Sequence, residues 1–343
     1  MEPPENKTIA GFILLGFSDT PHLLHPLFSF FLVSYVLCIA GNTFIFMLIV
    51  SQLQLHTPMY ILMGNLAFVD VCFTSIIVPR TLYGLLSGDI HISIHGCFVQ
   101  LFLFLAVANM DSYLLAIMAF DRYCAVCFPL RYLIIMNSRT CNSLVAFCWT
   151  TVCLHSAFCI VLTTYRPFCR WVIPHYFCDL PIIMQLSCSG GSEALNQAGF
   201  IEASIVVFSP MLFILITYIL IIRAVLALKS SQAKRKTFST CSSHLTMVIL
   251  LYSTIIFMYF RPSTMYSPTY DRDIILPSGP GFGVFELCGR TGRCSNKGAR
   301  RPTQLVLGAT TACGFSPPHR SAIRHEIASS SAPPLRSCQM AGQ

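Results

Sequence analysis

The sequence predicts an all-α membrane protein, a bundle of six transmembrane helices followed by an atypical C-terminal tail. Only 10% of its residues are charged and 55% are hydrophobic, whereas soluble domains contain roughly 25% charged residues. Six stretches approach the roughly 20 apolar residues that cross a bilayer. Apolar and polar residues do not alternate with the period of two that a membrane barrel needs. The spans are therefore helices, because a helix satisfies all its backbone polar groups internally.

The six predicted helices define three regions of the chain. The first helix starts too late and is too long for a cleaved signal peptide, so we interpret it as a retained span. The predicted regions are an N-terminal segment 1–25, a bundle 26–273 and a tail 274–343. The predicted helices cover about residues 27–50, 58–79, 98–120, 140–162, 198–222 and 240–260.

Basic residues concentrate in the loops after the third and fifth spans, where Asp121 is the only acid. Cytoplasmic loops carry an excess of Lys and Arg, so these loops are predicted to be cytoplasmic and the N-terminus extracellular. Asn6 lies in an Asn-Lys-Thr sequon, which predicts a glycan on the same, extracellular side. The basic residues are Arg122, Arg131, Arg139, Arg223, Lys229, Lys234, Arg235 and Lys236, and the opposite loops carry Asp89, Asp179 and Glu193.

The chain changes character at Ile274. Residues 1–273 hold 14 basic and 12 acidic residues, a net charge of +2, whereas residues 274–343 hold 8 and 2, a net charge of +6. Gly, Pro and Ser make up 24 of the last 70 residues. This composition predicts a disordered tail. An even number of spans returns the chain to the side where it began, so the tail is predicted to lie outside as well. In that oxidising compartment Cys288 and Cys294 could pair.

Five separated stretches occur in the order typical of one receptor family. They are Gly41-Asn42, LHTPMY at 55–60 with its continuation to Asp70, MAFDRYCAVCFPLRY at 118–132, the cysteines around HYFCD at 175–179, and KTFSTCSSHL at 236–245. Together they resemble the odorant (olfactory) receptors among the rhodopsin-like G-protein-coupled receptors. The resemblance covers about residues 6–273 and implies a rhodopsin-like helical bundle.

The chain departs from this family at two points. Thr217-Tyr218 stands where the family usually has Ser-Tyr, a mild change. After Asp273 the family continues into a seventh helix with an Asn-Pro pair and a Tyr near its end, and no such pattern follows here. We interpret the sequence from about Ile274 as an altered reading frame or alternative exon, with a lineage-specific tail as the alternative.

The resemblance implies a plasma-membrane receptor for small volatile odorants. It would activate a heterotrimeric G protein of the olfactory stimulatory class, which raises cAMP. The alternative is a non-functional product that lacks the seventh helix and is retained in the endoplasmic reticulum. A transporter is less consistent with the sequence, since paired broken half-helices are absent. No His-Glu-x-x-His or Gly-x-Ser-x-Gly motif indicates an enzyme, and we expect no nucleic-acid partner.

Asp70 and Asp111 lie inside predicted spans, where ionisable residues are costly and usually functional. The resemblance places both carboxyl groups together, and such a pair must share a proton or bind a cation. It implies a sodium ion held with Asn42, the one cofactor that we expect. Hydrogen bonds to neighbouring helices are the alternative. Cys124 and Cys127 have CxxC spacing but no neighbouring His or second CxxC, so no further metal site is expected.

Arg122 follows Asp111 by 11 residues, almost three helical turns, so both project from one helix face about 16 Å apart. Asp121 can hold Arg122 as an ion pair, and the resemblance implies that movement of the sixth helix releases it toward the G protein. A snorkelling arginine and ordinary interhelical hydrogen bonds are the alternatives. The residues assigned to this switch are Asp121, Arg122, Tyr123, Tyr218 and His244.

The resemblance also implies an odorant pocket and two disulfides. The pocket would lie between the third, fifth and sixth helices, where mostly apolar walls and a few polar groups suit small organic molecules. Four cysteines permit three pairings, and the resemblance implies Cys97–Cys178 and Cys169–Cys188. The predicted pocket residues are Phe104, Leu105, Ala108, Asn109, Ser112, Val206, Tyr252 and Tyr259.

Overall fold

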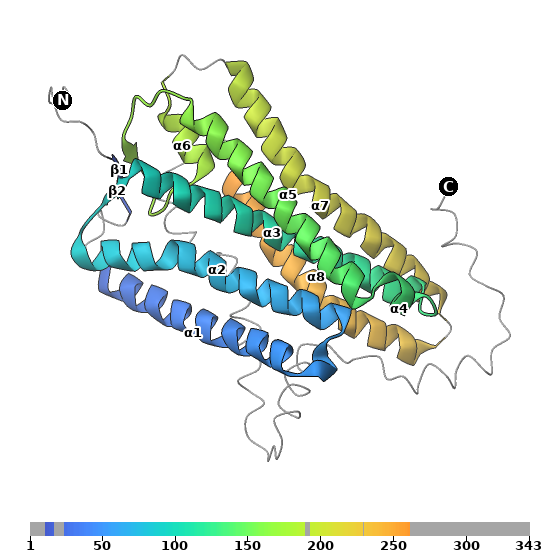
Figure 1. Cartoon of the computed structure of the whole chain (residues 1–343). Helices are drawn as coiled ribbons and strands as arrows, with labels where there is room; N and C mark the ends of the chain where they lie inside the picture. The colour runs from blue at the N-terminus through green and yellow to red at the C-terminus, as the bar shows by residue number, and fades with distance from the viewer. Residues whose placement is uncertain (1–10, 17–23, 189–192, 229, 261–343) are drawn as a thin grey trace, which may run out of the picture.

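The computed structural model describes residues 11–16, 24–188, 193–228 and 230–260. Asn6 and the whole 274–343 tail, about which the sequence makes predictions, therefore lie outside the described residues. The described part is a bundle of long helices (Figure 1), of which six are long and apolar enough to cross a membrane. These helices are α1 (Leu24–Ser51), α2 (Pro58–Ser87), α3 (Ile94–Cys127), α5 (Ser138–Thr164), α7 (Glu193–Ala227) and α8 (Ser231–Tyr259).

Each predicted span coincides with one of these helices, but the helices are longer. α2, for example, continues to Ser87 and ends at Gly88, whose φ of 66° lies in the left-handed region that glycine adopts readily. α3 begins after Ser93, whose side chain accepts a hydrogen bond from the Gly96 N–H at 3.0 Å. Hydropathy identifies the apolar part of a helix, whereas the caps determine where it ends.

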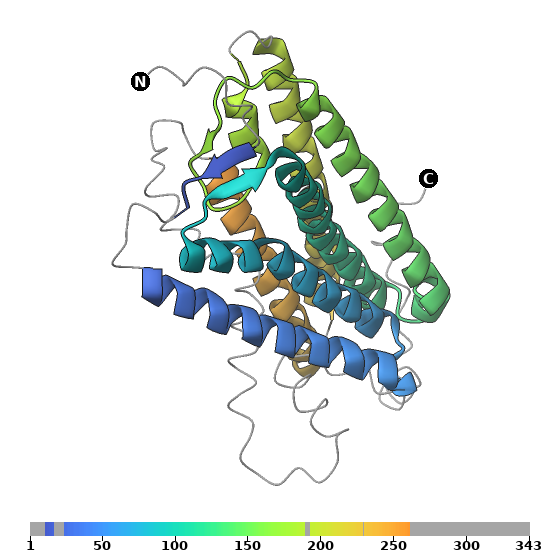
Figure 2. The same ribbon diagram turned by 60° about the vertical axis from the view of Figure 1, so that its left-hand side comes forward.

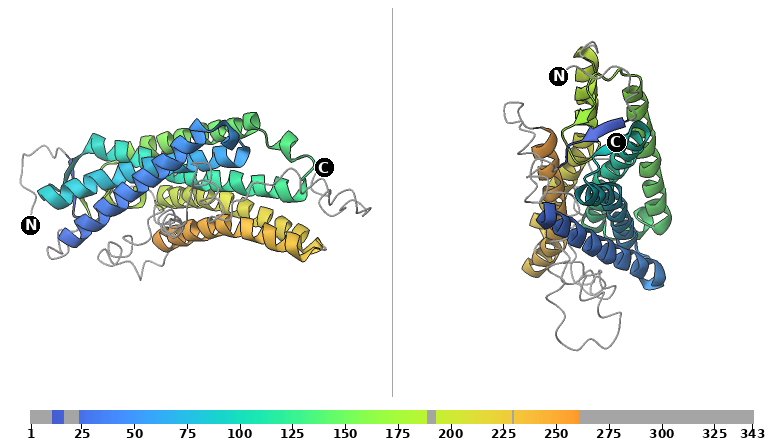
Figure 3. Two further views of the ribbon diagram at one scale, coloured as in Figure 1. Left: turned by 90° about the horizontal axis from the view of Figure 1, so that it is seen from below. Right: turned by 90° about the vertical axis from the view of Figure 1, so that its left-hand side faces the viewer.

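α3 is the central helix of the bundle. Its apolar stretch is 67% buried, against 17% for that of α1, and it contacts α2, α5, α7 and α8. α1 packs mainly on α2. Figure 3 shows α3 between the α1–α2 pair and the α7–α8 pair. Side chains on several faces of α3 are therefore buried, and the functional residues predicted between Phe104 and Arg122 lie along this central helix.

A small sheet covers one end of the bundle, here called the sheet end (Figure 2). It consists of β1 (Gly11–Leu14), β2 (His91–Ser93) and β3 (Val172–Ile173) in the order β2-β1-β3, with β1 antiparallel to β2 and parallel to β3. Phe12 is fully buried, with its ring centroid 5.6 Å from that of Phe168 and 5.5 Å from that of Trp171. The sheet therefore has a small apolar core of its own.

Both predicted disulfides are present at the sheet end. Cys97–Cys178 joins the first turn of α3 to the segment before the short helix α6 (Leu180–Leu186), with a Cα–Cα distance of 5.6 Å. Cys169–Cys188 closes the segment that contains β3 and α6. The Cys178 N–H also donates to Gln100 Oε1 at 3.2 Å. These links hold the segment 169–188 against the first turns of α3. This segment forms part of the site described below.

The opposite end, here called the α4 end, carries the shorter elements η2 (Leu53–Leu55) and α4 (Tyr132–Ile135). α4 follows directly on α3 and packs back against it. This return places Tyr132 beside the last turns of α3, a contact described below.

Candidate functional site

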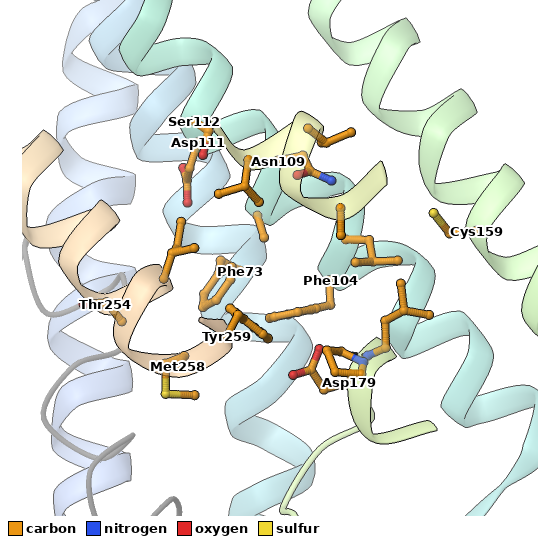
Figure 4. A pocket seen from close by; sticks show the side chains of 18 of the residues that line it. Phe73, Phe104, Asn109, Asp111, Ser112, Cys159, Asp179, Thr254, Met258 and Tyr259 are labelled. Carbon is orange, nitrogen blue, oxygen red and sulfur yellow. Dashed lines mark hydrogen bonds between the residues drawn. The ribbon is translucent and has the colours of Figure 1, made fainter. Parts of the chain in front are cut away.

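A cavity of about 210 Å³ lies between α3, α5, α7 and α8, with α2 and the α6 segment completing its walls. Its surface is mainly apolar, with the aromatic rings of Phe73, Phe104 and Phe177 among the walls, and Figure 4 shows several of these side chains. The lining residues are Phe73, Ile77, Phe104, Leu105, Ala108, Asn109, Asp111, Ser112, His155, Cys159, Tyr176, Phe177, Asp179, Leu180, Pro181, Glu202, Ala203, Val206, Val207, Leu251, Thr254, Ile255, Met258 and Tyr259.

Seven of the eight pocket residues predicted from the sequence line this cavity, and Tyr252 does not. Tyr252 and Tyr259 are seven residues apart on α8 and so share a helix face. The α8 residues that line the cavity extend from Leu251 to Tyr259, and Tyr252 lies at the edge of the face that they form. Tyr252 is 4% exposed, packs in the hydrophobic core and lies beside Ser112. Its placement in the lining was therefore wrong.

Asp179 also lines the cavity, although the sequence indicates only an acidic loop residue at this position. It precedes α6, where its Oδ1 accepts a hydrogen bond from the Leu180 N–H at 2.8 Å. Burial raises the pKa of Asp179 from its ordinary value to about 6, and hydrogen bonds from Tyr259 and the Leu180 N–H partly oppose this rise. Because Asp179 comes from a loop, hydropathy and helical spacing gave no signal for its position.

Two further polar side chains missed by sequence reasoning meet across the cavity wall. His155 on α5 contacts Glu202 on α7 through Nε2 and Oε1. Cys159, one turn beyond His155, places its Sγ 3.5 Å from the same Nε2. All three side chains line the cavity. No local motif connects them, because Glu202 is 43 residues after Cys159 and only the packing of α5 against α7 brings them together.

The predicted Asn42, Asp70 and Asp111 set lies at the junction of α1, α2 and α3. Asp70 and Asp111 are 5% and 4% exposed, and their carboxyl groups are near enough to interact electrostatically. Asp111 Oδ1 accepts no hydrogen bond from the described residues. Asn42 donates to the Cys38 carbonyl at 3.2 Å, and Cys38 Sγ lies 3.8 Å from Thr74 Oγ1. Thr74 in turn donates to the Asp70 carbonyl at 2.9 Å.

Tyr218 and His244 are in direct contact and connect three helices. The Tyr218 hydroxyl lies 2.7 Å from His244 Nδ1, and His244 Nε2 lies 3.1 Å from the Leu115 carbonyl oxygen. A carbonyl can only accept, so Nε2 donates to it and Tyr218 donates to Nδ1, the arrangement of a neutral imidazole. Tyr218 comes from α7, His244 from α8 and Leu115 from α3, so this network links α8 to the central helix.

Asp121 is 1% exposed and accepts a hydrogen bond of 2.7 Å from the Tyr132 hydroxyl. Burial, followed by the nearby charge of Asp121, raises the pKa of Tyr132, so the phenol remains a donor. The charged Arg122 side chain is near enough to interact electrostatically with Asp121, Tyr218 and His244. The structure therefore brings the predicted switch residues into one region and adds Tyr132, which the sequence motif contained without revealing its role.

Tyr123, the remaining residue assigned to the switch, is half-buried. Its ring lies edge-on to Phe128 with the centroids 5.6 Å apart, and its centroid is 6.4 Å from that of Phe120. Both ring contacts lie within the end of α3 and the residue that follows it, Phe128.

The chain is similar to known receptors over most of its length. A family described as "7 transmembrane receptor (rhodopsin family)" matches residues 41–275. Human Olfactory receptor 1L6 is 44% identical over 268 residues, 78% of this chain and 77% of that protein. Human Olfactory receptor 1L4 is 43% identical over 263 residues, which are 76% of this chain and 84% of that protein. Mouse Olfactory receptor 1E16 is 40% identical over 269 residues, which are 78% of this chain and 85% of that protein. The family match ends beside the compositional change at Ile274.

Proposed function

Because this chain belongs to the olfactory receptors of the rhodopsin family of seven-transmembrane receptors, we propose that it binds a small volatile organic molecule and activates a G protein. The G protein would be heterotrimeric and of the stimulatory class that raises cAMP. The observation that carries the proposal is the mainly apolar cavity along α3, the helix that also carries Asp121 and Arg122 near its other end. This family is a class of receptors and not of enzymes.

The sheet end would face outside the cell and the α4 end the cytoplasm, at the plasma membrane. Two observations support this orientation. The disulfides lie at the sheet end, and disulfides form in oxidising compartments. Arg131 and Arg139 lie at the α4 end, as expected for a cytoplasmic face. The cavity would then lie on the extracellular side of the Tyr218–His244 network, in the position for a ligand to influence it.

The size and lining of the cavity favour a small, mainly apolar ligand. Its volume of about 210 Å³ is below the roughly 300–1,000 Å³ of sites for drug-sized molecules. Asn109, Ser112 and Thr254 are among the few hydrogen-bonding groups in a mainly apolar wall. Binding would therefore depend on burial plus one or two oriented hydrogen bonds, and an agonist would have to bind the active arrangement more tightly than the resting one.

Filling the cavity should weaken the response to an odorant. Ala108→Phe adds a ring to a lining position, so we expect the concentration of an activating odorant that gives half-maximal cAMP to rise about tenfold or more. The measurement is odorant-evoked cAMP in cells, normalised to surface receptor. Val99→Phe adds a ring on the same helix at a side chain that is 59% exposed and outside the lining, and it should respond normally. Equal loss in both variants would contradict the proposed pocket.

The Tyr218–His244 network would act as a restraint on α8. His244→Phe removes both of its side-chain hydrogen bonds, which should free the cytoplasmic half of α8 and raise basal cAMP several-fold. Thr246→Val is a suitable control, because this exposed residue donates only within α8, to the Ser242 carbonyl at 2.9 Å. Unchanged or lower basal cAMP in His244→Phe at equal surface level would rule out the restraint.

Asp70 and Asp111 would hold a sodium ion with Asn42 nearby. The unpartnered Asp111 Oδ1 and the two adjacent carboxyl groups fit a hard cation that takes oxygen ligands. The purified receptor should therefore melt at a higher temperature in sodium chloride than in choline chloride at equal ionic strength. Asp111→Asn should lose this difference, whereas Asp89→Asn, at a half-buried loop residue outside this set, should keep it. Equal melting temperatures of the unaltered receptor in both salts would contradict the sodium site. A proton shared between Asp70 and Asp111 would then explain how the two buried carboxyl groups lie so close together.

A second candidate is an inactive receptor product retained in the endoplasmic reticulum. The support is specific: no seventh-helix pattern follows Asp273, and the family match ends at residue 275. Without a seventh helix one wall of the bundle would be missing and buried polar residues such as Asp70 would be less protected from lipid, which is costly.

Replacing residues 274–343 by the matching C-terminal part of Olfactory receptor 1L6 tests this second candidate. With an N-terminal tag, we expect the natural chain to give little staining of intact cells and strong staining after permeabilisation, and the chimera to stain intact cells. Strong surface staining of the natural chain, with an odorant-evoked cAMP rise, would reject retention. Staining of the tag on intact cells also tests the proposed orientation.

A further inference from the structure

We propose that His155, Cys159 and Glu202 form a binding site for a transition metal of the zinc class, with an open coordination position that faces the cavity. Imidazole, thiolate and carboxylate are the three ligand types that zinc takes in proteins. The proposal goes beyond the receptor function proposed above, because neither odorant binding nor G-protein activation requires a metal.

The backbone places the three ligands on facing helices. His155 and Cys159 are four residues apart on α5 and therefore share a helix face. Glu202 extends from α7 on the other side of the site. One ligand atom from each residue lies within 4.8 Å of the other two. The set therefore needs adjustment of side chains only, without a shift of either helix.

The distances suit a tetrahedral ion. Metal–ligand bonds of about 2.0–2.3 Å place neighbouring ligand atoms of a tetrahedral zinc about 3.3–3.6 Å apart. Cys159 Sγ is already 3.5 Å from His155 Nε2. Glu202 Oε1 contacts the same nitrogen directly, so this contact would have to lengthen for an ion to enter. The Glu202 side chain is 39% exposed and has the rotatable bonds to do so.

The charges of the three side chains are compatible with a divalent ion. A carboxylate inside a transmembrane bundle is costly without a compensating charge. A divalent cation would balance the Glu202 carboxylate and the Cys159 thiolate, with His155 bound as neutral imidazole. On binding, Cys159 releases its thiol proton to solvent. His155 Nδ1 is buried and makes no hydrogen bond to the described residues, so contacts at Nε2 orient the ring.

The site would be exchangeable and not purely structural. Sites with three protein ligands keep a fourth position for water or substrate, whereas structural zinc sites are closed by four protein ligands. His155, Cys159 and Glu202 all line the cavity, and Figure 4 shows Cys159 extending from α5 toward it. The fourth position would therefore take water or a Lewis-basic atom of a molecule in the cavity.

Binding of Co²⁺ to the purified full chain tests the proposal with a spectroscopic signal. We expect about one equivalent of Co²⁺ to produce thiolate-to-cobalt charge-transfer absorption in the near ultraviolet, and Zn²⁺ to displace it. Cys159→Ser should remove this band. His155→Ala and Glu202→Gln should weaken Co²⁺ binding about tenfold or more. No odorant is needed, so failure of this experiment is distinct from failure of the receptor function.

Cys153→Ser is the matched control, because Cys153 is a free, half-buried cysteine on the same helix outside the cluster. It should retain the band and the Co²⁺ affinity. No band in the natural chain, or a band that survives Cys159→Ser, would overturn the site, the latter by assigning the metal to other cysteines. As a check on folding, Zn²⁺ should raise the melting temperature of the natural chain and of Cys153→Ser but not of Cys159→Ser.

Discussion

The central packing of α3 is the constraint on which the rest of the structure depends. A helix that contacts four others must be buried on most of its surface, and α3 is accordingly buried over 67% of its apolar stretch. Its first turn is fixed by Cys97–Cys178, and near its other end Asp121 accepts a hydrogen bond from Tyr132. Between these points α3 contributes walls of the cavity, Asp111 and the Leu115 carbonyl. A rigid, central α3 thus provides a common frame for sites that belong to different helix pairs.

Three clusters of buried or half-buried polar groups occur at helix junctions. Asp70 and Asp111 lie between α2 and α3, Tyr218 and His244 between α7 and α8, and His155 and Glu202 between α5 and α7. In an apolar interior each such group needs a partner, since an unpaired polar group there is costly. Helix movement would break or re-form these contacts, which is consistent with the receptor function proposed above. Apolar packing alone could tolerate many small helix shifts, because it does not favour one helix position over nearby ones as a hydrogen bond does.

The sequence predicted the helices well and their boundaries less well. Six apolar stretches are sufficient to identify six helices, because lipid leaves the backbone little alternative. The extension of α2 to Ser87 depends instead on Gly88, and the strand pairing of Gly11–Leu14 depends on segments 80 to 160 residues away. Phe104, Ala108 and Ser112 line the cavity because helical spacing places them on one side of α3. Tyr252 does not line it, although the residue before it, Leu251, does. The direction in which the side chain leaves α8, and not its depth along the helix, therefore decides this contact.

The sequence by itself determined the membrane class, the six spans and, through its motifs, the receptor family with its two disulfides. Composition and local order are enough for these because they are set by lipid and by residues close in the chain. Only the tertiary structure decided that Tyr132 holds Asp121, that Asp179 enters the cavity and that His155, Cys159 and Glu202 meet. Each of these contacts joins residues from different elements, so its existence depends on how helices and loops pack and has no signature in local sequence.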